Sequence, residues 1–155
     1  MRILGIDPGL QHTGWGIIEI NNGKLSYIAD GTINSNVKDE LSVRLKSLHQ
    51  GICEVIETHK PDQAAIEETF VNSNPQSTLK LGQARGALIL APALYGITVS
   101  EYAPNKIKKA VVGSGHAQKA QIDLMVKMLL PGAKPKSKDS ADALAIAICH
   151  SAYSS

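Results

Sequence analysis

Aromatic side chains and sulfur are scarce in this 155-residue chain, which has one phenylalanine, one tryptophan and two cysteines. Cys53 and Cys149 lack CxxC spacing, so we expect two buried thiols and neither a disulfide nor a zinc site. No apolar run approaches the roughly 20 residues of a membrane helix, and the N-terminal MRILGIDPG is typical of a strand, not of a signal peptide. These absences predict a cytoplasmic protein that contacts no membrane.

A strong excess of charge of either sign is also missing, because 16 Lys and Arg residues face 14 Asp and Glu residues, a net charge of +2. So small an excess does not by itself indicate a polyanionic partner. The remaining surface would become clearly basic if several carboxylates held metal ions. A hydrophobic content of 43% suits one globular domain over residues 1–155.

Hydrophobic periodicity predicts three strands first and then alternating helices and strands. The expected strands cover residues 2–7, 14–20, 24–33, 62–67 and 97–102. The expected helices cover residues 39–59, 76–94, 104–112, 119–130 and 139–152, and Pro92 should kink or end the second of them. Crossovers lead to the later strands, so the order predicts a mixed, five-stranded α/β sheet flanked by helices, which resembles the ribonuclease-H-like fold.

Two acidic residues stand at the ends of predicted strands. Asp7 is followed by Pro8-Gly9, and Glu67 ends the fourth strand. Ligands bind at strand ends of open sheets, where crowded carboxylates need a cation. Asp139 and Asp142 are three residues apart at the start of the last helix, so they share a face and could complete the site. Oxygen ligands alone favour Mg²⁺ or Mn²⁺ over zinc.

Each of these acids also has an ordinary structural explanation, because acids often cap helices and follow strands. That explanation weakens where Asp142 lies within ADALA and Glu67 follows AAI, since an idle charge among apolar neighbours is costly. Side chains alternate along a strand, so Glu67 and Glu68 point to opposite faces and only one can join the site. We expect Glu67.

Five segments, in this order, resemble the RuvC family of crossover-junction (Holliday junction) endodeoxyribonucleases: ILGIDPGLQHTGWGII, AIEETF, LKLGQARGALI, EYAPNKIKKAVVGSGHAQKAQI and DSADALAIAICH. The resemblance spans nearly the whole chain. It implies a hydrolase that binds metal through Asp7, Glu67, Asp139 and Asp142. Two Mg²⁺ ions per site, for which Mn²⁺ can substitute, would serve paired, symmetric nicking of four-way junctions in DNA recombination and repair. The products would carry 5′-phosphate and 3′-hydroxyl ends.

The resemblance also implies DNA contacts. Lys119 matches a family lysine near the scissile phosphate, where it would neutralise developing charge. Lys106, Lys108 and Lys109 match a DNA-facing helix start. Phe70, ahead of an expected polar loop over residues 71–77, matches an aromatic that stacks on an unpaired base near the crossover. The plainer alternatives are solvated lysines and a core ring.

The expected helix 76–94 is apolar around much of its circumference, and Gly82 and Gly86 would let another helix approach closely. We expect it to pack on the sheet and on a partner in a two-fold homodimer, with internal packing alone as the alternative. The family also implies a branch-migration complex of the RuvA and RuvB type as partner. His150, near the end of the last helix, is expected to be a cation that complements the helix dipole.

Two other functions remain open from the residues. IDPGLQHTGWG also resembles the phosphate-binding hairpin of actin-like and sugar-kinase ATP-binding halves, although those proteins need a second similar domain. A non-catalytic junction-binding protein would keep the fold as a recognition module. A nucleotide titration tests the first alternative, and metal-dependent nicking tests the second.

Overall fold

The computed structural model describes residues 1–70 and 73–154, so the start of the expected loop 71–77 lies outside the described residues. The described chain forms one sheet with the order β3-β2-β1-β4-β5. Its strands are β1 (Arg2–Asp7), β2 (His12–Asn21), β3 (Lys24–Asn34), β4 (Gln63–Glu67) and β5 (Thr98–Tyr102). β1, β2 and β3 are antiparallel neighbours, whereas β4 runs parallel to β1 and β5 parallel to β4. The predicted mixed, five-stranded sheet is confirmed.

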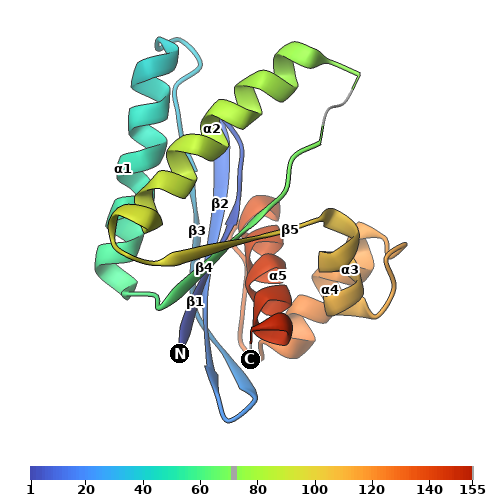
Figure 1. Ribbon diagram of the computed structural model, residues 1–155. Coiled ribbons are helices and arrows are strands. Elements are labelled where there is room, and N and C mark those ends of the chain that lie inside the picture. Colours follow the sequence, from blue (N-terminus) through green and yellow to red (C-terminus); the bar gives the residue numbers. More distant parts are fainter. Residues whose placement is uncertain (71–72, 155) are drawn as a thin grey trace.

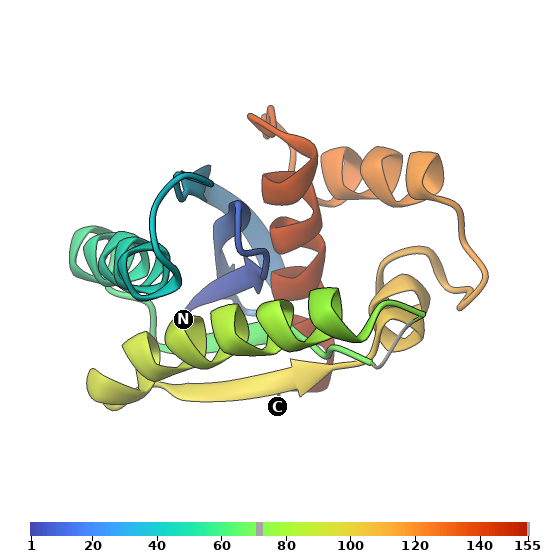
Figure 2. The same ribbon diagram turned by 90° about the horizontal axis from the view of Figure 1, so that it is seen from above.

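Helices cover both faces of this sheet (Figures 1 and 2). They are α1 (Leu41–His59), α2 (Pro75–Leu94), α3 (Pro104–Val112), α4 (Lys119–Leu129) and α5 (Lys138–Tyr153). Alternation along the strands divides the core: Leu4 and Ile6 pack with α1 and α2, and Ile3 and Ala65 pack with α3, α4 and α5. Side chains of odd-numbered positions in β1 and β4 therefore face α5.

The element types agree with the sequence prediction; half of the ends coincide, and the others differ by one or two residues. Pro92 lies in the last turn of α2, which ends two residues later, before Gly96 with its φ of 74°. Both thiols are free, and Cys149 is buried. No helix within residues 1–70 and 73–154 is long and apolar enough to cross a membrane.

Glycines let α5 lie directly on β1 and β2. A Cβ atom at Gly5 would overlap the carbonyl oxygen of Ala143, and one at Gly14 would overlap the carbonyl oxygen of Asp139. Close approach of two backbones is a common reason for glycine inside a strand. The first turn of α5 is thereby brought to the carboxyl end of β1.

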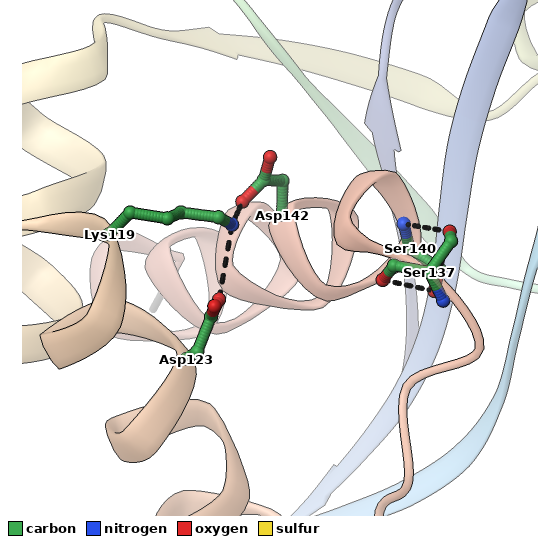
Figure 3. A network of polar contacts seen from close by, with 5 residues as sticks. All are labelled: Lys119, Asp123, Ser137, Ser140 and Asp142. Carbon is green, nitrogen blue, oxygen red and sulfur yellow. Dashed lines mark hydrogen bonds and ion pairs between the residues drawn. The ribbon is translucent and has the colours of Figure 1, made fainter.

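The start of α5 is also tied to the sheet by hydrogen bonds. Ser137 and Ser140 form a reciprocal cap in which each backbone N–H donates to the other's hydroxyl, both at 3.0 Å (Figure 3). The Ser137 hydroxyl lies 2.8 Å from the hydroxyl of Thr32 in β3. The fully buried Asp30 accepts a hydrogen bond of 2.8 Å from the backbone N–H of Lys136. These contacts fix the position of α5, and hence of its acids, relative to the strands.

Candidate active site

Three of the four predicted acids come together where β1 meets α5. Asp7 is the last residue of β1, and Asp139 and Asp142 lie in the first turns of α5. One carboxylate oxygen of each lies within 4.8 Å of the others. Asp7 shares the strand face of Gly5, which contacts α5, so strand alternation and the docking of α5 together explain the cluster.

Glu67 flanks this cluster and is not part of the group of three. It ends β4 on the same face as Ala65 and lines a cavity of about 480 Å³ together with Lys108, Lys119 and Asp142. Its charge nevertheless reaches the cluster, because it helps to raise the pKa of Asp7. The cavity thus joins Glu67 and Asp142 to two of the predicted lysines, whereas Asp7 and Asp139 are not among its lining residues.

The acids repel one another in a partly buried setting. Burial raises the pKa of Asp7 to about 7, with further increases from the charges of Glu67 and Asp139 and an opposing effect of Lys119. Burial also raises the pKa of Glu67, which Lys108, Lys119 and Arg85 oppose. Negative charge is therefore costly at this site, and a bound cation would remove that cost.

The donor set fits a hard divalent cation. The group of three contains carboxylates only, without histidine or cysteine. Such oxygen ligands are those of Mg²⁺ and Mn²⁺, whereas zinc favours nitrogen and sulfur. Crowding and burial of the same carboxylates add an electrostatic reason for a cation here.

Lys119, the first residue of α4, joins the acids as a counter-charge. Its ammonium contacts Asp142 Oδ1 and lies 3.1 Å from Asp123 Oδ1 (Figure 3). Sequence reasoning singled out Lys119 and missed Asp123. The spacing of four residues within one helix was the available signal.

Of the three predicted DNA-binding lysines in α3, one lines the cavity and two lie outside it. Lys108 lines the cavity, whereas the ammonium of Lys106 lies 4.2 Å from the ring centre of Tyr153 and 5.5 Å from that of Tyr102. Lys109 is exposed. The structure therefore brings Lys108 to the acids and leaves Lys106 and Lys109 outside the cavity.

Phe70 is 59% exposed and follows β4 by three residues. The alternative expectation, that the Phe70 ring is buried in the core, is therefore wrong. Arg85, which sequence reasoning did not single out, supports the same segment: its Nε donates to the Glu67 carbonyl oxygen at 3.1 Å, and its guanidinium pairs with Glu101. Arg85 thereby holds the end of β4 that carries Glu67.

The prediction that His150 is a cation at the helix end is wrong. The side chain is 4% exposed, and burial lowers its pKa, so it is neutral at pH 7. Its Nε2 lies 2.6 Å from the Gln63 Oε1, which can only accept, so Nε2 carries the proton. Nδ1 then accepts from the Tyr102 hydroxyl at 2.8 Å. His150 joins α5 to β4 and β5 instead of facing solvent.

Comparison with known proteins agrees with this architecture. The family model described as "Crossover junction endodeoxyribonuclease RuvC" matches residues 3–150. A relative of that name from Ruegeria pomeroyi is 59% identical over 155 residues, which is 100% of this chain and 93% of the relative. Another from Rhodospirillum rubrum is 56% identical over 153 residues, 99% of this chain and 90% of the relative.

Solved structures give the same result. RuvC from Thermus thermophilus superimposes with a TM-score of 0.90 at 32% identity, covering 99% of this chain and 95% of that one. The T. thermophilus RuvC solved with a Holliday junction substrate gives a TM-score of 0.92 at 32% identity, covering 99% and 94%. These matches confirm the predicted ribonuclease-H-like fold. The chain belongs to the RuvC family of crossover junction endodeoxyribonucleases.

Proposed function

We propose that this chain is an endonuclease that resolves four-way Holliday junctions in DNA recombination and repair by nicking two opposed strands. The observation that carries the proposal is the group of three carboxylates from Asp7, Asp139 and Asp142 beside a cavity lined by Glu67 and lysines. It stands on a fold that matches a RuvC solved with a Holliday junction substrate.

The site would hold two Mg²⁺ ions, which Mn²⁺ can replace. Their ligands would be the carboxylates of Asp7, Glu67, Asp139 and Asp142. When bound, these ions supply an activated water and charge stabilisation for the leaving oxygen. Each carboxylate would contribute an oxygen ligand. Burial first, and then the charges of Glu67 and Asp139, raise the pKa of Asp7 to about 7, so a bound cation would relieve both costs. No side chain has to form a covalent bond to DNA.

The cationic residues have different proposed roles. Lys119 and Lys108, which line the cavity, would neutralise charge that develops on the scissile phosphate. Lys106 and Lys109 lie outside the cavity and would contact phosphates of the DNA arms at most. Phe70, exposed beyond β4, would stack on a base at the crossover. Attack of water on phosphorus with O3′ as the leaving oxygen would break the P–O3′ bond and leave 5′-phosphate and 3′-hydroxyl ends, which can be ligated.

A homodimer would present one such site to each of two equivalent strands. Exposed leucines on α2 support it, since Leu79, Leu90 and Leu94 are 65%, 51% and 67% exposed. The space beside Gly82 and Gly86 is open, so the backbone of a second helix could approach there. Docking of a branch-migration complex of the RuvA and RuvB type and a cytoplasmic location stay predictions.

The test is cleavage of a mobile synthetic four-way junction in Mg²⁺, with linear duplex as the substrate control. The wild type should make paired, symmetric nicks, and Asp7→Asn and Glu67→Gln should bind the junction without cutting. If the wild type binds the junction but cuts it in neither Mg²⁺ nor Mn²⁺, the nuclease proposal fails and a non-catalytic junction-binding protein takes its place. The ATP-binding alternative has little support, because the RuvC family model accounts for residues 3–150.

A further inference from the structure

Lys119 lies between two carboxylates that belong to different helices (Figure 3). Asp142 comes from α5 and is one of the three clustered acids, whereas Asp123 comes from α4, one turn after Lys119, and is outside that group. The ammonium contacts Asp142 Oδ1 and lies 3.1 Å from Asp123 Oδ1. One positive charge is thus shared by a proposed metal ligand and by an acid with no such role.

A cation at the clustered acids and the ammonium of Lys119 compete for Asp142. While no cation is bound, Lys119 compensates part of the negative charge there. Once a divalent cation binds the same carboxylate, the ammonium becomes a like-charged neighbour, and like charges at contact distance repel. Binding of the cation therefore requires Lys119 to give up part of its contact with Asp142.

Asp123 offers Lys119 a second partner that needs no backbone movement. Both residues lie in α4 at positions i and i+4, so rotation of the lysine side chain is sufficient. Helix stability does not explain this pair. A lysine in the first turn faces the positive end of the helix dipole, and an acid placed after the lysine is the less stabilising order.

We propose that Asp123 is a positioning residue: it retains Lys119 beside the cavity when a divalent cation takes Asp142, and so lowers the cost of cation binding. This inference rests on the proposed metal-dependent nuclease function. Without Asp123, the cation would have to break the Lys119–Asp142 pair with no replacement partner. The lysine would also lose the contact that keeps it near the substrate phosphate.

The expected effect is modest, because the side chains of Lys119, Asp123 and Asp142 are 44%, 38% and 36% exposed. Exposed ion pairs are weak, so Asp123→Asn should reduce cation affinity about two- to five-fold. Asp123→Glu keeps the charge within reach of Lys119 and should restore most of the affinity. Lys119→Met removes the competitor and should increase affinity.

The experiment measures Mn²⁺ binding to the metal-free protein, by the electron paramagnetic resonance signal of free Mn²⁺ at fixed pH and salt. The variants are Asp123→Asn, Asp123→Glu, Lys119→Met and the double variant with Asp123→Asn and Lys119→Met. Asp39→Asn, an exposed acid that precedes α1, is the matched control for charge. Thermal unfolding verifies that each variant is folded.

The inference expects the effect of Asp123→Asn to vanish in the Lys119→Met background. An effect of equal size in both backgrounds would mean that Asp123 acts through its own charge, and an effect no larger than that of Asp39→Asn would mean that it does not act. Either result overturns the positioning role. A wild type that binds no Mn²⁺ would instead overturn the proposed metal site, and the positioning role with it.

Discussion

Asp7 lies directly opposite Gly14 in the β1–β2 ladder, and the backbone of Asp139 rests against that same glycine. The two proposed ligands meet because the position between them has no side chain. The geometry of the site therefore depends on how closely α5 approaches β2, and not only on the acids themselves.

Gly14→Ala should destabilise the protein and weaken cation binding, because the added methyl would overlap the Asp139 carbonyl oxygen and displace α5. Overpacking of this kind costs about 1–3 kcal/mol. Urea unfolding measures the cost, and Mn²⁺ titration measures the damage to the site. Gly115→Ala, where a Cβ would make only ordinary contacts starting at 3.6 Å, should change neither. Equal effects at the two glycines would contradict this account.

Asp7→Asn should stabilise the metal-free protein at neutral and higher pH. The pKa of Asp7 is about 7 in the folded protein against an ordinary value of 3.8, so between these values the folded state holds the extra proton. The contribution of Asp7 to the free energy of unfolding is therefore fully present below about pH 4 and is lost as the pH rises to 7. The difference in free energy of unfolding between Asp7→Asn and the wild type should grow over that pH range by at most about 4 kcal/mol and then level off. Urea unfolding at several pH values in a chelator measures it, and a difference independent of pH would contradict the shift.

Mg²⁺ should raise the thermal stability of the wild type at pH 8, because ligands that bind only the folded state stabilise it. At 100 times the dissociation constant the gain is about 2.7 kcal/mol. A chelator should reverse the gain and abolish junction cleavage. Asp139→Asn should lose most of the Mg²⁺ effect, since Asp139 is one of the three clustered acids. Differential scanning calorimetry with and without Mg²⁺ provides the measurement, with the protein in chelator-containing buffer as the metal-free reference.

His150→Ala should destabilise the fold by about 1–3 kcal/mol, because the half-buried Gln63 and the buried Tyr102 would each lose a hydrogen-bond partner. The lowered His150 pKa also means that the unfolded chain takes up a proton first, so wild-type stability should fall as pH drops below 6.5. His116→Ala, at an exposed position, is the control. If both variants unfold at the same urea concentration, the buried network contributes nothing.

Phe70→Ala should leave the urea midpoint unchanged, because the ring is 59% exposed. It should slow junction cleavage, since removal of one stacked base contact costs about 1–3 kcal/mol. A 2-aminopurine placed at the crossover should lose its fluorescence change in this variant, and Phe70→Tyr should recover it. If Phe70→Ala cleaves the junction at the wild-type rate, the ring does not contribute to DNA binding.

The sequence by itself determined the element order, the fold class and the family, because these follow from local periodicity and from motifs that are contiguous in the chain. It also pointed to Asp7, Glu67, Asp139 and Asp142, since strand ends and helix spacing are local properties. The tertiary structure decided which side chains of different helices and strands contact one another. It placed Glu67 beside the acidic group, separated Lys108 from Lys106, and paired Lys119 with Asp123 as well as Asp142.

His150 illustrates the reason for this division. From the chain it is a histidine near a helix end, where a charged form is favourable. Only the packing of α5 on β4 and β5 brings Gln63 and Tyr102 to its two nitrogens and removes it from water. Local sequence specifies which conformation a segment prefers, whereas charge state and contacts depend on residues distant in the chain, which only the folded structure brings together.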